Sequence, residues 1–341
     1  GGGVGVVNAD IFGSLGSVAE LNRVSEQEME HGRDEMFVVL SNVHLDDEMV
    51  MEKLETLFEG FEGMAAANGV VEVSDDEDAA SSQGQQMPQK QLPVFILMGN
   101  FTCQPLGHSQ QNGLKQLTSL FDDLGSLIQQ FPILASHGRF VFVPGPQDTG
   151  PMSALPFPPI SKLVTNGLRN MIPHATFATN PCRLRFFTKE IVIYRNSIVN
   201  PIRRNSILPV RTPQATPPMD EDVMVVEEEE EYDVVQHAVK TILDQTHLSP
   251  LPLTIQPIYW QYDHALRLYP LPDAVILADD ACVDPYNRVY MDTDVLHPGS
   301  FEKGEFVVYK PVVVEEEEED GGMGEEVRRM VTSRVEPSRI E

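Results

Sequence analysis

Cysteine is scarce in this sequence, and its three cysteines, Cys103, Cys182 and Cys282, are far apart. No two of them have the Cys-x-x-Cys spacing of a zinc site. An odd number at such distances also does not suit the disulfide framework of a small secreted protein. We therefore expect three free thiols that behave as small, half-buried apolar side chains in a reducing compartment.

Long hydrophobic runs are missing as well. No stretch of about 18 apolar residues, the length needed to cross a bilayer, is present. The chain shows no secretory signal peptide and opens on Gly1-Gly2-Gly3 without an initiator Met, which suggests a fragment or a processed chain. Hydrophobic residues still make up 41% of the sequence, enough for a core, and 341 residues allow two domains or one α/β domain with inserts.

Basic residues are few: 24 Lys and Arg face 52 Asp and Glu, which gives a net charge of −28. The acidic residues are concentrated in runs at positions 75–78, 220–222, 227–231 and 315–320. Binding to a phosphate backbone depends on Lys and Arg, which release counterions from the nucleic acid, so this balance opposes direct binding to DNA. A role on DNA would have to be exerted through other proteins.

Short apolar runs alternate with stretches of helical periodicity in the first half of the chain. These runs predict buried strands at 36–41, 93–98 and 139–143, and a later run predicts one at 274–277. Apolar residues spaced three and four apart predict helices over 50–61 and 114–128. The later sequence is richer in strands, and we expect 174–179 and 190–194 to belong to a second sheet. The pattern favours an α/β fold in which two sheets are flanked by helices, an αββα sandwich.

Polar residues follow the predicted strands in a recurring manner. The first strand leads into Ser41-Asn42-Val43-His44 and the second into Gly99-Asn100. The third is followed by Pro144-Gly145-Pro146-Gln147-Asp148. A later strand runs into Asp279-Asp280-Ala281, and Pro298-Gly299-Ser300 comes after it. Several such segments in one order are more specific than any one of them alone.

This series resembles the metal-dependent phosphoesterases and is most similar to the B-subunits of eukaryotic replicative DNA polymerases. The match through Pro257-Ile258-Tyr259-Trp260 and Arg267-Leu268-Tyr269-Pro270 points to the polymerase epsilon branch. The resemblance covers roughly residues 36–309. It implies a phosphoesterase fold of the calcineurin-like type that has lost its activity and is retained as a scaffold.

The resemblance also implies where metal ligands have been lost. Active phosphoesterases carry Asp-x-His, Gly-Asp, Gly-Asn-His-Asp/Glu and Gly-His-x-His motifs around a two-metal site. The degenerate positions here are Asn42, His44, Asn100, Gln147, Asp148, His247, Asp279 and Ala281. Only His44, Asp148 and His247 could still bind a metal, so we expect no catalytic residue, no metal and no cofactor. The other histidines, His297 among them, are expected to be surface or hydrogen-bonded residues.

Two alternatives remain open. One is an active metallophosphoesterase with an altered metal site. The other is a regulatory module that binds a phosphopeptide or nucleotide in the relic pocket, although no Arg cluster near the loops favours it.

The sequence divides into a connector at 1–33, a phosphoesterase-like domain at 34–313 and an acidic, charged tail at 314–341. Two inserts, 68–91 and 200–232, interrupt the domain. Inserts and tail contain too little apolar surface to offset the entropy of ordering them, so we expect them to be mobile and removable.

The resemblance implies a non-catalytic accessory subunit in the nucleus. Its expected partners are the C-terminal, zinc-bearing region of the catalytic subunit of DNA polymerase epsilon and, through a region N-terminal to this chain, the helicase component GINS. Contact with DNA would be indirect, and no membrane is involved. Tyr259, Trp260 and Tyr262 are candidate partner-binding residues because Trp and Tyr dominate the energetics of interfaces; a place in the core is the alternative.

Overall fold

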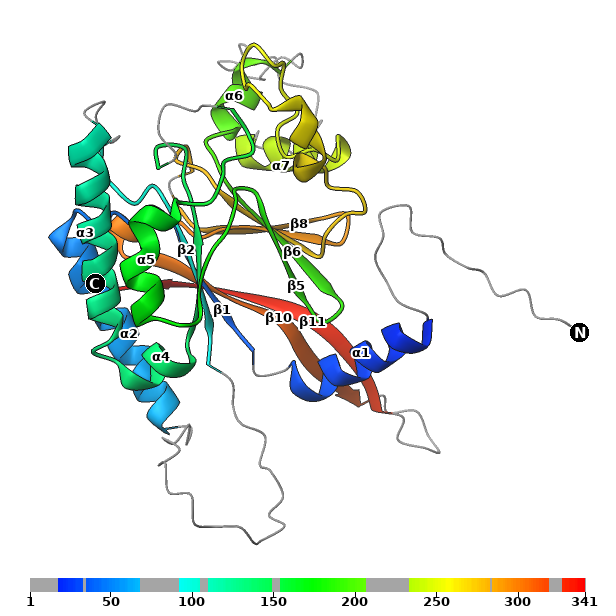
Figure 1. The fold of residues 1–341 in the computed structure, drawn as a ribbon. Coiled ribbons are helices and arrows are strands. Elements are labelled where there is room, and N and C mark those ends of the chain that lie inside the picture. Colours follow the sequence, from blue (N-terminus) through cyan, green and yellow to red (C-terminus); the bar gives the residue numbers. More distant parts are fainter. Residues whose placement is uncertain are drawn as a thin grey trace, which may run out of the picture.

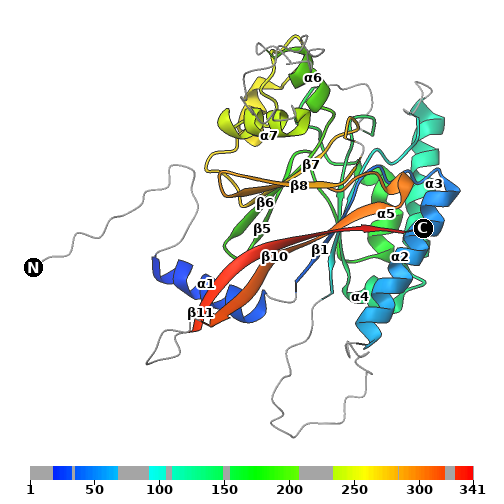
Figure 2. The same ribbon diagram turned by 180° about the vertical axis from the view of Figure 1, so that it is seen from behind.

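Two β-sheets pack face to face, and helices cover the outer face of each (Figures 1 and 2). The computed structural model describes residues 18–32, 35–67, 92–104, 110–148, 154–206, 233–282, 284–318 and 327–340. The helices are α1 (Val18–His31), α2 (Glu48–Ala67), α3 (Gln110–Ile128), α4 (Pro132–His137), α5 (Lys162–Met171), α6 (Val199–Arg204), α7 (Val234–Asp244) and the short 3-10 helices η1 (Trp260–Leu266) and η2 (Phe301–Lys303). None of these helices is long and apolar enough to span a bilayer.

The first sheet has the strand order β11-β10-β1-β2-β3-β4, and the second has the order β5-β6-β7-β9-β8. The strands are β1 (Phe37–Leu40), β2 (Val94–Met98), β3 (Arg139–Val143), β4 (Ala175–Phe177), β5 (Cys182–Phe186), β6 (Lys189–Arg195), β7 (Ala274–Ala278), β8 (Tyr286–Tyr290), β9 (Thr293–His297), β10 (Glu305–Glu318) and β11 (Val327–Arg339). Strands β1 to β4 are mutually parallel, and so are β6, β7 and β9. Each sheet therefore has a set of strands whose carboxyl ends meet at one edge.

Alternation along the strands produces three apolar layers. On β1, Val38 and Leu40 belong to the core beneath α2, α3 and α5, whereas Phe37 and Val39 face the second sheet. On β6, Ile193 faces the first sheet and Val192 faces the core beneath α6 and α7. Because side chains alternate with period two, each strand contributes to two layers. The fold is the αββα sandwich that the sequence predicts.

Strand β4 corrects one assignment. The sequence placed 174–179 in the second sheet, but β4 pairs in parallel with β3 at the edge of the first. The ring of Phe177 stacks on that of Phe142, with centroids 4.6 Å apart, and joins the helix-side core. Propensity identified the strand, but tertiary packing decided which sheet it joined.

Strand β11 corrects another. Residues 314–341 were expected to form a tail, yet β10 continues to Glu318 and β11 returns antiparallel to it as the outermost strand. Partly buried Val335 packs in the layer between the sheets, and Ile340 packs against the helix-side core. The register sets Glu316 opposite Arg329. An edge strand is held by backbone hydrogen bonds to its single neighbouring strand. The composition of the segment does not show that such a neighbour is available.

The predicted connector and inserts overlap the described residues only in part. Helix α1 occupies 18–31 and lies beside the β10 and β11 pair (Figures 1 and 2). The second insert begins later than predicted, because α6 belongs to the fold and buries Val199 and Ile202 in the outer core of the second sheet. The insert at 68–91 and residues 207–232 lie outside the described residues.

Candidate functional site

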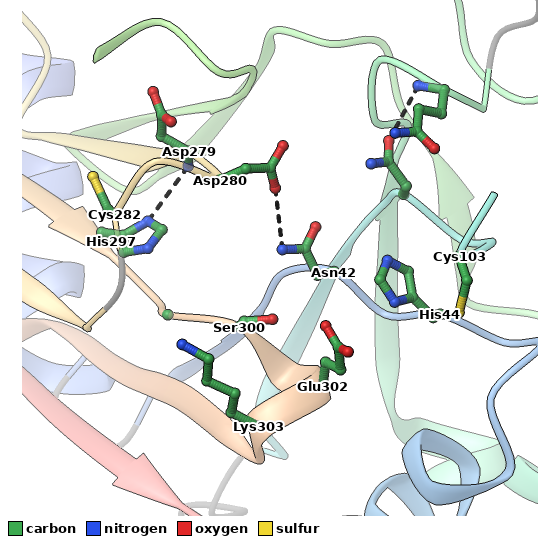
Figure 3. Close-up of a pocket in the computed structure, with 13 residues that line it drawn as sticks. Asn42, His44, Cys103, Asp279, Asp280, Cys282, His297, Ser300, Glu302 and Lys303 are labelled. Carbon is green, nitrogen blue, oxygen red and sulfur yellow. Dashed lines mark hydrogen bonds between the residues drawn. The ribbon is translucent and has the colours of Figure 1, made fainter. Parts of the chain in front are cut away.

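The parallel strands of both sheets end around one cavity of about 350 Å³ (Figure 3). The loops that follow β1, β2, β3, β7 and β9 supply its walls. Carboxyl ends of parallel strands are where α/β folds place their ligand sites. The lining residues are Asn42, His44, Asn100, Cys103, Gln147, Asp279, Asp280, Cys282, His297, Gly299, Ser300, Glu302 and Lys303.

The cavity brings together most of the degenerate metal-site positions. Asn42, His44, Asn100, Gln147 and Asp279 line it, although they come from four separate loops. Asn42 adopts a left-handed backbone conformation, φ 56°, which Asn tolerates better than most residues. The strand topology therefore brings these residues, which are far apart in the sequence, together around one cavity.

Three of the predicted positions, Asp148, His247 and Ala281, are not among the residues that line the cavity. Nε2 of His247 lies 3.2 Å from Oδ1 of Asp263, and this Asp is also paired with Arg267. Ala281 packs against the outer core of the second sheet. The assignment of His247 and Ala281 to the site is therefore corrected. The segment around His247 resembled the family motif, but it pairs with the η1 segment instead.

Asp148 lies buried behind the cavity and joins two loops. Its Oδ1 accepts a hydrogen bond from the backbone N–H of Phe101 at 2.8 Å, and its Oδ2 accepts one from Gly145 at 2.7 Å. Burial raises the pKa of Asp148 to about 6, although these hydrogen bonds and the charge of Arg195 act in the opposite direction. Both oxygens therefore hold the β2 and β3 loops together.

Asp279 is engaged in the same manner. Its Oδ2 accepts the backbone N–H groups of Ile198 and Val199 at 2.6 and 2.7 Å, and its Oδ1 accepts that of Ala281 at 2.7 Å. Asp279 is only 2% exposed. Its carboxylate fixes the start of α6 to the end of β7, so it serves the backbone and has little capacity left for a ligand.

His297 is a cavity residue that sequence reasoning missed. It is 2% exposed, and burial lowers its pKa, so the ring is neutral at physiological pH. Its Nδ1 lies 3.0 Å from the carbonyl oxygen of Leu277 and 3.5 Å from the backbone nitrogen of Asp279, so the ring is held at the end of β7. Nε2, on the cavity side, makes no hydrogen bond of ordinary geometry with a described residue. The available signal was its position directly after an apolar strand and before Pro298-Gly299-Ser300.

Arg195 is the second missed residue. It is the last residue of β6, it is completely buried, and its guanidinium pairs with Asp280 at 2.6 Å. The signal was a charged residue at the end of the apolar run Ile191–Tyr194. Lys and Arg are almost never fully buried unless they are paired.

The residues of the cavity do not fit a two-metal centre. Such a centre needs several carboxylate and imidazole ligands that converge on two cations. Asp148 and Asp279 bind backbone N–H groups, and Asp280 binds Arg195. Within the described part of the chain, no group of three or more His, Cys, Asp or Glu side chains is arranged to hold a metal.

The thiols are also unsuited to nucleophilic chemistry. Partial burial and the nearby Asp46 raise the pKa of Cys103 to about 11. Burial, followed by the charge of Asp279, raises that of Cys282 to about 12. The thiolate is the reactive form, and at neutral pH it is scarcely populated in either residue.

An exposed apolar surface lies on η1 and its flanking loops, near α6 and α7 (the yellow segment in Figure 1). Trp260 is 74% exposed, which excludes the alternative that it belongs to the core. Leu266, in the same segment, is completely buried. We define the Trp260 surface by its exposed members: Leu253, Ile255, Tyr259, Trp260, Tyr262 and Tyr269.

Comparison with known proteins places this chain among polymerase subunits. The family model that describes the B-subunit of DNA polymerase alpha/epsilon matches residues 37–283. The B-subunit of DNA polymerase epsilon from Arabidopsis thaliana is 36% identical over 308 residues, which cover 90% of this chain and 50% of that protein. DNA polymerase epsilon subunit 2 of Homo sapiens is 35% identical over 304 residues, with 88% and 48% covered.

The mouse relative, DNA polymerase epsilon subunit 2 of Mus musculus, is 36% identical over 302 residues, 88% of this chain and 48% of that protein. The chain thus spans about half the length of the curated relatives it matches. With the family model covering most of the sandwich, the chain belongs to the B-subunit family of DNA polymerases alpha and epsilon.

Proposed function

We propose that this chain is part of a non-catalytic accessory subunit of DNA polymerase epsilon that acts in the nucleus. In this role it binds the C-terminal, zinc-bearing region of the catalytic subunit and helps to link the polymerase to the replicative helicase through GINS. The names of the curated relatives support the polymerase epsilon assignment. The partner regions follow from the family resemblance.

One observation carries the proposal that the domain is not an enzyme: its buried carboxylates serve the fold. Asp148 and Asp279 accept backbone N–H groups with both oxygens. A carboxylate held in this manner stabilises loops, whereas metal-assisted hydrolysis needs carboxylates directed at cations. The domain then acts through what it binds.

The Trp260 surface is the candidate binding surface. Aromatic and aliphatic side chains dominate interface energetics, and the residues behind this surface are fixed by a buried core and by the Asp263–Arg267 ion pair. A stable interface of this kind should bury well over roughly 2,000 Å² in total. The net charge of −28 opposes direct contact with the DNA backbone.

Co-expression with the C-terminal tails of the catalytic subunits of polymerases alpha, delta and epsilon tests the proposal. We expect only the epsilon tail to co-purify at high salt. Trp260→Ala should weaken that retention, whereas Leu163→Ala, at a residue 86% exposed on α5 in the opposite helix layer, should not. Equal retention of all three tails, or loss of the epsilon tail, would overturn the proposal.

His44 favours the second candidate, an active phosphoesterase with an altered metal site. It lines the cavity, and its buried Nδ1 has no hydrogen-bond partner among the described residues. We expect the purified chain to carry no stoichiometric divalent metal and to hydrolyse neither phosphomonoesters nor phosphodiesters. Restoring Asp at both Asn42 and Asn100 should not create activity. Metal-dependent turnover that His44→Ala abolishes would establish the second candidate instead.

A further inference from the structure

The guanidinium of Arg195 lies inside a cage of oxygen atoms at the junction of the two sheets. Nε donates to the carbonyl oxygen of Gly99 at 2.6 Å, and Nη1 donates to that of Ala278 at 3.3 Å. Nη2 donates to Oδ1 of Asn42 at 2.5 Å and to Oδ1 of Asp280 at 2.6 Å. These oxygens come from the loops after β1 and β2 in the first sheet and from the end of β7 in the second.

Such a cage is suited to a cation. Carbonyl, amide and carboxylate oxygens that converge from separate loops are the ligand set of a hard metal ion. Only one of the four direct ligands, Asp280, carries a charge, because position 42 is an Asn. A single positive charge therefore balances the direct ligands, whereas a divalent ion would leave an excess charge in a buried place.

The shape of the cage also suits a guanidinium. Its planar fork presents five N–H donors in fixed directions, so one side chain can satisfy acceptors from several loops. The backbone of Arg195 is held as well, since its N–H donates to Oδ1 of buried Asn180 at 3.1 Å. This hydrogen bond fixes the backbone from which the Arg195 side chain extends.

Asp280 responds to this charge. Burial acts to raise the pKa of Asp280, but the charge of Arg195, with hydrogen bonds from Ser197, Arg195 and Asn42, outweighs it and holds the pKa below the usual value. Asp280 is thus ionised at neutral pH. The side chain of Arg195 is 1% exposed and that of Asp280 46%, so the cation is the enclosed partner.

We propose that Arg195 is a built-in cation, which takes the place that a metal ion would hold at the ends of these strands and makes the junction of the two sheets independent of metal. In this proposal the chain has lost metal-binding side chains and has also gained a guanidinium in place of a metal ion. The neutral Asn42 and the cationic Arg195 are two parts of one change.

Chemical rescue tests the proposal. Arg195→Ala removes the cation and should lower the melting temperature of the full chain by more than about 5 °C. Guanidinium chloride at low millimolar concentration should then raise the melting temperature of this variant, because the free ion enters the vacated cage. Urea, which has a similar shape and no charge, should not.

Matched controls define the outcome. Arg267→Ala removes an exposed arginine that is also paired with an Asp, and guanidinium should not rescue it. Failure of guanidinium to stabilise Arg195→Ala, or equal stabilisation by urea, would overturn the proposal.

A second set of measurements is available if Arg195→Ala does not fold. The wild-type chain should bind no stoichiometric Mg²⁺, Mn²⁺ or Zn²⁺ in elemental analysis, and EDTA should leave its melting temperature unchanged. Arg195→Met combined with Asp280→Asn should melt higher than Arg195→Met alone, since the double variant leaves no uncompensated carboxylate. Stoichiometric metal in the wild type, or a double variant no more stable than the single one, would contradict the built-in cation.

Discussion

Gly99 lies so close to Asp148 that a β-carbon on residue 99 would stand 1.9 Å from Oδ2 of that carboxylate. The same β-carbon would lie 2.6 Å from the backbone nitrogen of Gly145. The Asp148 carboxylate must lie this close to the backbone of residue 99 because it accepts hydrogen bonds from the β2 and β3 loops at the same time. The walls of the cavity depend on two loops being in direct backbone contact.

Gly99→Ala should therefore destabilise the fold by roughly 2–4 kcal/mol, since the added methyl group must displace buried backbone or break the hydrogen bonds of Asp148. Gly60→Ala is the control, because Gly60 is exposed on α2 and its β-carbon would meet nothing within 4 Å. That change should be neutral or stabilise by up to about 1 kcal/mol. Similar effects of the two substitutions in chemical denaturation would contradict the close approach.

Asp148 should give stability a specific dependence on pH. Its pKa is raised from 3.8 to about 6, so the folded protein binds this proton more tightly than the unfolded chain does. The contribution of Asp148 to the free energy of unfolding therefore falls as pH rises from 3.8 through about 6.

Asp148→Asn should cost roughly 1–3 kcal/mol at neutral pH, because an amide NH₂ then faces one of the two backbone donors. The advantage of the wild type over this variant should increase as the pH is lowered through the same window. His297, whose lowered pKa acts in the opposite direction, is present in both proteins and cancels in the difference. A difference that is constant with pH would show an unshifted pKa, and one that shrinks in acid would show a lowered pKa; either result would contradict the raised pKa of Asp148.

Trp260 should contribute little to the stability of the isolated chain. Because 74% of the Trp260 surface is exposed, Trp260→Ala should change the free energy of unfolding by less than about 0.5 kcal/mol. Leu266→Ala, in the same segment but completely buried, should cost roughly 2–5 kcal/mol. If Trp260→Ala proved as destabilising as Leu266→Ala, its effect on partner binding would have to be attributed to folding.

Ending the chain after Glu318 should destabilise the fold, although composition alone would mark the removed segment as dispensable. The truncation removes β11 together with the packing of Val335 and Ile340, at a cost of roughly 2–4 kcal/mol. Deleting residues 68–91, which are poor in apolar side chains, should cost little and serves as the control. An unchanged melting temperature after the truncation would mean that β11 adds nothing to the sheet.

The sequence by itself determined the layers of this protein. Apolar runs such as Val94–Met98 and apolar stripes such as the one through Leu54 and Phe58 encode burial locally, since period two and period 3.6 each specify which side of an element faces a core. The order of the loop motifs, with Asn42, Asn100 and Asp148 after successive strands, identified the family. These features can be predicted from the sequence because each depends on neighbours only a few residues away.

Only the tertiary structure decided what the loop residues do. Arg195 donates hydrogen bonds to Gly99, 96 residues away in the sequence, and to Asp280, 85 residues away. No local sequence pattern predicts such long-range pairs. Strand β11 forms in a segment whose composition predicted a mobile tail, because β10 offers it a row of backbone hydrogen-bond partners. His297 reaches the cavity and His247 does not, since the chain path places one at the end of a central strand and the other beside η1. The physical reason is the same in each case: burial of charge and pairing of backbone groups are satisfied by whatever the fold brings close in space, and that depends on distant parts of the chain.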